Sequence, residues 1–326
     1  MARTIVADTQ LADGRLLDVA QAGAGDAEVI AGVIVDAFGH RAAVEPRPAA
    51  LDETAQSVAA ALGQGFGVLA LVDGEPAGVV IVSIDDPAHG SRAGRAGVHR
   101  VSVRPAYQQH GVASVMLRVV GDMLAARGIG EVRLVARAEF PETVEWWRRH
   151  GFTEYGREGT EIRLRNSVPI RVEVPTAEDM RALGVRLAAL LRAGDVLIAS
   201  GELGAGKTAL AQGIGEGLCV RGPVISPTFV LSRVHPSLAG GPAFVHVDAY
   251  RLGSAAELED IDVDISLDDS VTYIEWGEGI AEGLADERLE VDIQRSLSPD
   301  DETRWVFFTP EGPRWESIRA QLEALA

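Results

Sequence analysis

The chain has 326 residues, about twice the length of a typical domain, so we expect two hydrophobic cores. Hydrophobic residues make up 47% of the sequence and charged residues 24%, a balance that excludes an intrinsically disordered chain. The formal net charge of −18 disfavours direct binding of nucleic acid, because that affinity depends largely on Lys and Arg. A single cysteine, Cys219, excludes an intramolecular disulfide and a cysteine-based zinc site.

The charges are unevenly distributed. Residues 1–165 carry 17 arginines and 21 acidic residues, whereas the rest of the chain carries 13 basic and 27 acidic residues. We therefore expect any link of the acidic second half to RNA to run through partner proteins. No stretch approaches the roughly 18 consecutive apolar residues of a membrane span, and residues 1–10 lack the layout of a secretory signal. These patterns predict a cytoplasmic protein with no membrane partner.

The first half of the chain predicts a mixed α/β domain. Its expected elements are an apolar segment over 27–38, a hairpin over 66–84, a strand over 98–103, an amphipathic helix over 112–124, a strand over 131–136, a helix over 141–150 and a strand over 161–165. Asp73-Gly74 is the expected turn of the hairpin. Arg127-Gly128 supplies a stop signal for the amphipathic helix.

We place the domain boundary near Asn166, which predicts domains over 1–165 and 166–326. Residues 170–174 alternate well enough to be the first strand of the second domain. Thr176, with Asp179 three residues later, resembles a helix N-terminal capping signal. A buried strand over 195–200 follows, and short apolar strands are expected over 243–247 and 271–274.

Residues 201–208, Gly-Glu-Leu-Gly-Ala-Gly-Lys-Thr, match the phosphate-binding pattern G-x-x-x-x-G-K-T between a predicted strand and a predicted helix. The glycines let backbone N–H groups at the helix N-terminus approach a phosphate closely. Lys207 would bridge the β- and γ-phosphates of ATP, and the Thr208 hydroxyl would bind Mg²⁺. The alternative is a glycine-rich turn without a ligand. Lys207 is the only lysine among 30 basic residues, which favours the phosphate site.

Two acidic residues follow short strands in the second half. Asp248 ends the strand predicted over 243–247, and Glu275 ends the strand predicted over 271–274. Open α/β sheets place their ligands at the carboxyl ends of such strands. Either residue could be an ordinary cap or loop residue, but the phosphate motif upstream favours a metal or catalytic role. Lys207, Asp248 and Glu275 are the predicted catalytic residues.

Four ordered motifs of the second half resemble the TsaE family. They are residues 201–208, Ser226-Pro227-Thr228-Phe229, the run His246-Val247-Asp248-Ala249-Tyr250-Arg251-Leu252, and Ile274-Glu275-Trp276. That family is the ATPase subunit of the bacterial machinery that installs threonylcarbamoyladenosine in tRNA. The resemblance implies partners, a sugar-kinase-like transferase subunit and its inactive paralogue, and only indirect contact with tRNA.

The same resemblance implies which residues of the second half bind ATP and Mg²⁺. The implied ATP-binding residues are Glu202, Leu203, Gly204, Ala205, Gly206, Lys207, Thr208, Ala209 and Thr228. Thr208 and Glu275 would contact Mg²⁺, and Asp248 would support the metal or the attacking water, with the two carboxylate roles open to exchange. All three belong to the predicted metal site.

A motif in the first half resembles the GNAT superfamily of acetyltransferases. Gln108-Gln109-His110-Gly111-Val112-Ala113 matches its Q-x-x-G-x-A signature, and residues 144–152 resemble its late helix, which ends in Gly-Phe. Backbone N–H groups of this loop would bind the pyrophosphate of acetyl-CoA, and the preceding strand edge would pair with the pantetheine arm. The expected acetyl-CoA residues are Val101, Val103, Gln108, Gln109, His110, Gly111, Val112, Ala113 and Ser114. The expected fold is thus a GNAT-like mixed sheet with helices, followed by a P-loop NTPase-type sheet flanked by helices.

The catalytic groups of the first half are not evident from the sequence. Many GNAT relatives place an acidic Tyr where this chain has Trp147, whose indole cannot protonate a thiolate. His99 and Glu139 lie on or just after strands, where a lone His or Glu usually has a structural role. The acyl acceptor stays open.

We interpret the chain as an ATPase of tRNA modification fused to an acetyl-CoA-binding module. The chief alternative is an N-acetyltransferase regulated by a nucleotide-sensing P-loop domain. A scaffold that holds ATP and CoA without turnover is a third interpretation. A small-molecule kinase is disfavoured, because no arginine-rich lid segment follows the P-loop.

Overall fold

The computed structural model describes residues 3–85, 94–227, 230–252, 254, 257–258, 267–296 and 301–326. The chain divides into two compact units, Met1–Val168 and Pro169–Ala326. The division lies close to Asn166, where the sequence places the boundary. Within the described residues, none of the helices combines the length and hydrophobicity that a bilayer-spanning segment requires.

The N-terminal unit is built on one eight-stranded mixed sheet of order β1-β2-β3-β4-β5-β6-β8-β7. Its elements are β1 (Ile5–Gln10), β2 (Leu16–Gln21), α1 (Ala27–Gly39), α2 (Ala55–Gly63), β3 (Gly65–Val72), β4 (Glu75–Asp85), β5 (Gly94–Val103), α3 (Val112–Ala125), β6 (Ile129–Arg137), α4 (Pro141–Arg149), β7 (Thr153–Glu158) and β8 (Glu161–Ser167). All neighbouring strands are antiparallel except β5 and β6.

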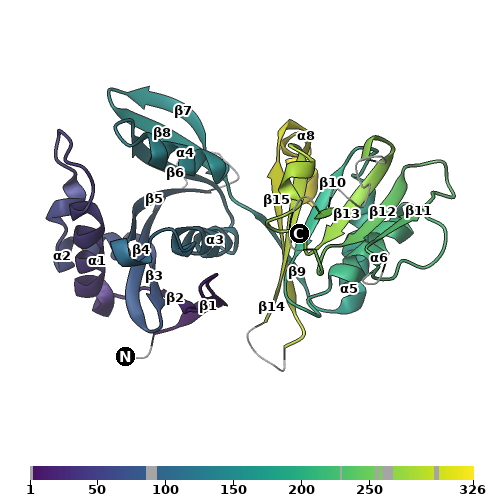
Figure 1. The fold of residues 1–326 in the computed structure, drawn as a ribbon, viewed down its shortest axis with the longest axis horizontal. Coiled ribbons are helices and arrows are strands. Elements are labelled where there is room, and N and C mark those ends of the chain that lie inside the picture. The colour runs from purple at the N-terminus through teal and green to yellow at the C-terminus, as the bar shows by residue number, and fades with distance from the viewer. Residues whose placement is uncertain are drawn as a thin grey trace. The chain divides into compact units, whose positions relative to one another are not determined.

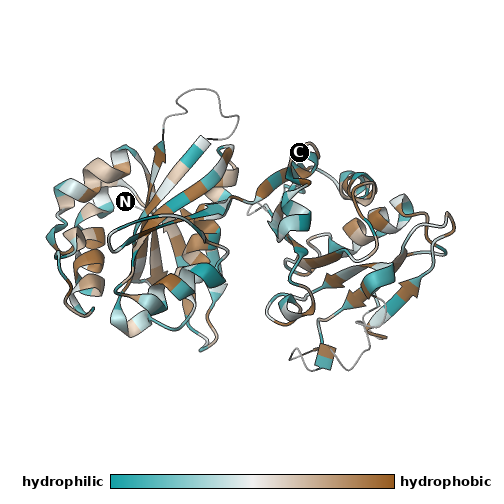
Figure 2. Ribbon diagram, turned by 90° about the horizontal axis from the view of Figure 1, so that it is seen from above, coloured by the Kyte–Doolittle hydropathy of each residue, from teal (hydrophilic) through white to brown (hydrophobic). Residues whose placement is uncertain are grey.

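Two hydrophobic cores cover the two faces of this sheet. Helices α1 and α2 pack on one face, against Leu69 and Ile81, and helices α3 and α4 pack on the other, against Val68 and Val80 (Figure 1). The central strands are buried on both faces, so they consist mainly of apolar residues rather than alternating with polar ones (Figure 2).

The C-terminal unit is built on a seven-stranded sheet of order β11-β12-β13-β10-β14-β15-β9. Its elements are β9 (Ile170–Val174), α5 (Ala177–Ala188), β10 (Val196–Ser200), α6 (Lys207–Gly217), β11 (Ser232–His235), β12 (Ala243–Asp248), β13 (Ser270–Glu275), β14 (Arg288–Arg295), β15 (Arg304–Glu311), α8 (Pro313–Glu316) and α9 (Arg319–Glu323). The strands β12, β13, β10 and β14 are parallel. Strand β11 pairs antiparallel with β12 at one edge, and β15 and β9 extend the sheet antiparallel beyond β14.

The predicted fold class is confirmed, and so are several local signals. Asp73 and Gly74 form the β3–β4 turn with φ angles of 50° and 83°, as a two-residue hairpin loop requires. The backbone N–H of Asp179 donates to the Thr176 hydroxyl at 3.1 Å, which caps α5. The strands β1, β2, β7, β11, β14 and β15 and the helices α2, α8 and α9 were not predicted.

Candidate functional sites

The loop over residues 201–208 connects the central strand β10 to helix α6. Gly201 has φ 132°, and a Cβ there would lie 2.4 Å from the Ile293 carbonyl oxygen, so only glycine fits. Gly206 has φ 116° and is the N-cap of α6, which turns the loop into the helix. The N–H groups of the first helical turn have no acceptor within the helix, so they can bind an anion.

Lys207 is buried within this loop, with only 4% of its surface exposed. Its ammonium donates to the carbonyl oxygens of Gly201 at 2.5 Å and Glu202 at 2.9 Å. The Nζ atom also lies 3.5 Å from the centroid of the Trp276 ring. Burial lowers the pKa of Lys207, and the nearby carboxylates of Glu275 and Asp248 partly offset that shift. Among the described residues, this ammonium has no direct ion-pair partner, so the loop contains a positive charge that is available to a phosphate.

The register of the parallel strands brings both predicted carboxylates beside this loop. Asp248 and Glu275 are Cα partners at the ends of β12 and β13. Glu275 is in turn the Cα partner of Ala199 on β10, two residues before the loop begins. Three adjacent strand ends thus converge at the start of the phosphate loop, as expected for parallel strands.

Glu275 is tied to the phosphate loop. The Thr208 hydroxyl donates to its two oxygens, at 2.9 Å from Oε1 and 3.2 Å from Oε2. The Nε2 atom of His246, a fully buried residue, lies 2.8 Å from Glu275 Oε1. The Tyr273 hydroxyl donates to the Lys207 carbonyl oxygen at 2.9 Å and anchors the start of α6 on β13.

Asp248 is tied to a different segment. The Ser226 hydroxyl donates to its Oδ2 atom at 2.8 Å, and the Tyr250 backbone N–H donates to its Oδ1 atom at 3.1 Å. Asp248 therefore contacts the segment that follows α6, whereas Glu275 contacts the phosphate loop itself. Thr228, an expected ATP residue, lies outside the described residues. The sequence indicated no role for His246, Tyr273 or Trp276, although His246 and Trp276 lie within the motifs that resemble the TsaE family.

The oxygens at this site fit Mg²⁺, which prefers hydroxyl and carboxylate ligands. In the part of the chain that the structure describes, no group of three or more His, Cys, Asp or Glu side chains is placed to hold a metal by itself. A hydroxyl and one or two carboxylates beside a phosphate loop fit the usual arrangement, in which nucleotide phosphates complete the coordination of the ion.

The second candidate site lies at the start of α3 in the N-terminal unit. Gly111, with φ 82°, is the N-cap of α3. A pocket there is lined by seven of the nine residues expected to bind acetyl-CoA, together with Tyr107 and Trp146, which were not predicted from the sequence. Val101 and His110 do not line it, and the Nδ1 atom of His110 lies 3.2 Å from Asp13 Oδ2.

Strand β5 offers an extended backbone edge that leads to this pocket. The parallel pairing of β5 with β6 covers only Gly94 to Gly97, while β5 continues to Val103. Within the described residues, no other strand pairs with β5 on the β6 side of residues 98–103. An elongated amide-containing ligand arm could therefore hydrogen-bond to this edge.

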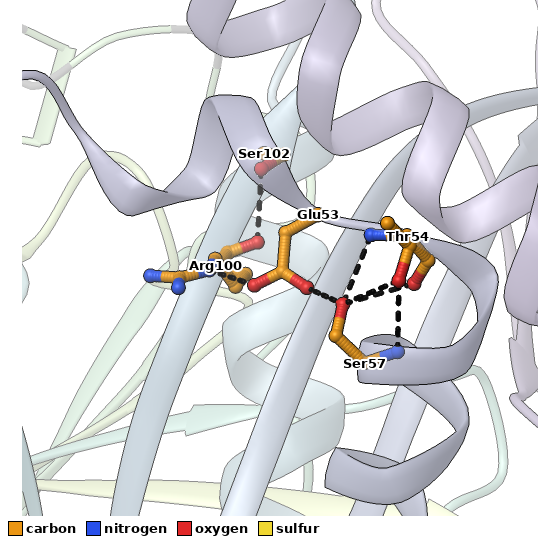
Figure 3. A network of polar contacts seen from close by, with 5 residues as sticks. All are labelled: Glu53, Thr54, Ser57, Arg100 and Ser102. Atoms are coloured by element: carbon orange, nitrogen blue, oxygen red, sulfur yellow. Dashed lines mark hydrogen bonds and ion pairs between the residues drawn. The ribbon is translucent and has the colours of Figure 1, made fainter.

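A left-handed residue shapes the middle of β5. Arg100 has φ 51°, and the β4–β5 register shifts beside it, which marks a β-bulge. Arg100 Nε donates to Glu53 Oε1 at 2.7 Å, and the Ser57 hydroxyl donates to Glu53 Oε2 at 2.5 Å (Figure 3). The Ser102 hydroxyl donates to the Arg100 carbonyl oxygen at 2.9 Å. The N-terminus of α2 thus holds the bulge, a link that no sequence signal indicated because its residues are distant in the chain.

Neither tryptophan of α4 supplies an acid. Trp147 is buried and packs edge-on against Phe152 with ring centroids 4.9 Å apart, whereas its neighbour Trp146 lines the pocket. His99 Nε2 lies 2.8 Å from Ser83 Oγ. Glu139 accepts a hydrogen bond from Arg137 at 2.6 Å, which lowers the pKa of Glu139.

Comparisons with known proteins match the two units separately. The family described as threonylcarbamoyl adenosine biosynthesis protein TsaE matches residues 174–304, and the acetyltransferase (GNAT) family matches residues 37–152. The tRNA threonylcarbamoyladenosine biosynthesis protein TsaE of Streptomyces coelicolor is 60% identical over 138 residues, which cover 42% of this chain and 93% of that protein.

Solved structures match in the same way. The crystal structure of YdiB from Bacillus subtilis is 29% identical with a TM-score of 0.39, and covers 48% of this chain and 95% of that chain. The PaiA N-acetyltransferase from Thermoplasma acidophilum in complex with coenzyme A is 13% identical with a TM-score of 0.40. It covers 46% of this chain and 98% of that chain.

Proposed function

The chain belongs to the TsaE family through its C-terminal unit, and from that premise we propose that this unit hydrolyses ATP during the biosynthesis of threonylcarbamoyladenosine in tRNA. The observation that carries the proposal is the convergence of Lys207, Thr208 and Glu275 at one end of the parallel sheet. The acidic composition of this half of the chain suits action through partners rather than direct tRNA binding. The proposed partners are the transferase subunit of that pathway and its inactive paralogue, in the cytoplasm.

Lys207 and Thr208 of the phosphate loop have different proposed roles. Bound ATP would supply the phosphoryl group, and Mg²⁺ would supply a Lewis acid that offsets its charge. The Lys207 ammonium would exchange its two carbonyl acceptors for phosphate oxygens, which are stronger acceptors. The Thr208 hydroxyl donates a hydrogen bond to Glu275, so the lone pairs of the hydroxyl oxygen stay available for a cation.

The two carboxylates take different proposed roles because their partners differ. Glu275 supports the metal side of the site through Thr208. Asp248 accepts from Ser226 and from the Tyr250 backbone, which leaves it to orient the attacking water or to sense the segment around Ser226. A carboxylate held by two donors keeps one orientation, as a water-positioning group needs.

The N-terminal unit is proposed to bind acetyl-CoA and to act as an N-acetyltransferase. Its GNAT match, the pocket at Gly111 and the open edge of β5 support this assignment. N–H groups of the α3 N-terminus would hold the pyrophosphate, and the β5 edge would bind the pantetheine amides. The seven predicted residues that line the pocket would form the phosphate end of this site.

The test measures phosphate release and acetyl-CoA binding on the full chain. We expect Mg²⁺-dependent phosphate release that Thr208→Val abolishes and Thr208→Ser largely keeps, because Ser retains the hydroxyl. Both variants should bind acetyl-CoA like the wild type. Phosphate release that is independent of Mg²⁺ and of Thr208 would refute the ATPase assignment. Co-purification with the transferase subunits tests the partners.

A further inference from the structure

His246 lies directly behind the carboxylate that contacts the phosphate loop. It stands on β12, two residues before Asp248, and it is completely buried. Its Nε2 atom lies 2.8 Å from Glu275 Oε1, the same oxygen that accepts the Thr208 hydroxyl at 2.9 Å. Two donors from two different elements therefore hold one oxygen of Glu275.

The hydrogen-bond chemistry assigns the direction of this contact. A carboxylate oxygen only accepts, so the proton between the two groups belongs to His246 Nε2. Among the described residues, the Nδ1 atom of His246 is buried and has no hydrogen-bond partner. A bare ring nitrogen costs less there than an N–H without an acceptor, so the geometry favours the tautomer with its proton on Nε2.

We infer that His246 is a positioning residue for Glu275, an inference that rests on the proposed ATP site. A glutamate side chain has several rotatable bonds, and Thr208 alone leaves the carboxylate free to turn about their contact. The second donor fixes Oε1, so that Oε2 keeps its place beside the Thr208 hydroxyl, where the cation is expected. Groups that orient metal-site ligands in this way typically change metal affinity or activity by about 10–100-fold when they are removed.

Packing is the competing explanation for a buried histidine. The ring of His246 packs against the rings of Phe244 and Tyr273, with centroid distances of 5.9 Å and 5.8 Å. His246→Phe keeps an aromatic ring in this stack but removes the donor. His246→Gln places an amide N–H near the position of Nε2, whereas His246→Asn is one methylene shorter and does not reach Glu275.

The experiment measures Mn²⁺ binding to the ADP complex of the full chain by electron paramagnetic resonance, with Mn²⁺ as a probe for Mg²⁺. We expect His246→Phe and His246→Asn to weaken Mn²⁺ binding by about 10–100-fold, and His246→Gln to stay within about threefold of the wild type. The affinity for ADP without metal should be unchanged in all three. In phosphate release, kcat should fall for Phe and Asn while the KM for ATP stays the same.

Three outcomes decide between the explanations. Wild-type Mn²⁺ affinity in His246→Phe would overturn the positioning role. The role would also be overturned if His246→Gln and His246→Asn lost Mn²⁺ affinity equally and in proportion to their loss of thermal stability. This second comparison remains valid even if the His246→Phe variant does not fold. No Mn²⁺ binding to the wild-type ADP complex would overturn the proposed ATP site itself, and the inference with it.

Discussion

The two units share the same backbone arrangement at the start of one helix, but the side chains that follow it differ. In each unit a strand leads into a loop, and a glycine with positive φ, Gly111 or Gly206, is the N-cap of the following helix. After Gly111 come Val112 and Ala113, which carry no charge. After Gly206 come Lys207 and Thr208, an ammonium and a hydroxyl.

This difference agrees with the proposed functions, in which the N-terminal loop only binds a pyrophosphate and the C-terminal loop also takes part in phosphoryl transfer. Backbone N–H groups and a helix N-terminus are sufficient to bind a pyrophosphate. Phosphoryl transfer also needs positive charge and a metal, and the ammonium of Lys207 and the hydroxyl of Thr208 are the groups proposed to meet these needs. Glu275 and Asp248 have no counterpart among the residues that line the N-terminal pocket.

The largest expected effect comes from Lys207→Ala. Removing the only ammonium of the loop should reduce phosphate release by about 10²–10³-fold, the usual cost of losing one electrostatic contact to developing charge. Acetyl-CoA binding, measured by calorimetry on the same variant, should not change. Loss of acetyl-CoA binding would contradict the assignment of separate ligands to the two loops.

Glu275→Gln tests the carboxylate beside Thr208, which has no counterpart in the N-terminal pocket. The amide keeps the size of the side chain but loses the charge beside Thr208, so half-maximal phosphate release should need about 10–100-fold more Mg²⁺. The matched control is Glu216→Gln, an exposed glutamate of helix α6. Equal Mg²⁺ requirements in the two variants would argue against a metal-side role for Glu275.

Gly111→Ala tests the feature that both loops share, an N-cap glycine with positive φ. A non-glycine residue at φ 82° is strained by about 1–2 kcal/mol, so acetyl-CoA affinity should fall by about 5–30-fold if the loop distorts. Gly32→Ala, within α1 and with open space around its Cβ, is the control. Phosphate release should be normal in both variants. Unchanged acetyl-CoA affinity in Gly111→Ala would place the ligand elsewhere.

The smallest effect concerns stability rather than ligands. Burial and the nearby Glu290 raise the pKa of Glu311, on β15, from its ordinary 4.5 to about 6. The folded state therefore binds this proton more tightly than the unfolded state, and the stabilisation is lost as pH rises through 6. Glu311→Gln should raise the free energy of unfolding by up to about 2 kcal/mol at pH 7.5 and have little effect at pH 4.5.

Urea unfolding of the full chain at the two pH values measures this difference. Glu302→Gln, an exposed residue of the same unit, is the control and should show no pH-dependent gain. A gain in Glu311→Gln that is equal at both pH values would show that the buried charge is not its cause.

Local signals were predicted well because each depends on neighbours in the chain. The Asp73-Gly74 turn, the Thr176 cap and the glycines around Lys207 impose backbone angles that adjacent residues alone determine. The resemblance to the TsaE and GNAT families is confirmed by the matched regions. Strand β14 was missed because its apolar residues alternate with charged and polar ones, and β15 was missed because its apolar run over 305–308 is short and is followed by Thr309 and Pro310.

The sequence by itself determined the two loop-to-helix transitions and the two strand-end carboxylates, since glycine, lysine and short apolar runs act through covalent neighbours and a general rule for parallel sheets. Only the tertiary structure decided which groups those carboxylates contact. Strand register placed His246 and Thr208 on Glu275 and left Ser226 to Asp248. In the same way, the packing of α4 turned Trp147 into the core and Trp146 toward the pocket. Successive residues of a helix point about 100° apart, so two neighbouring side chains can differ in that one is buried and the other lines the pocket.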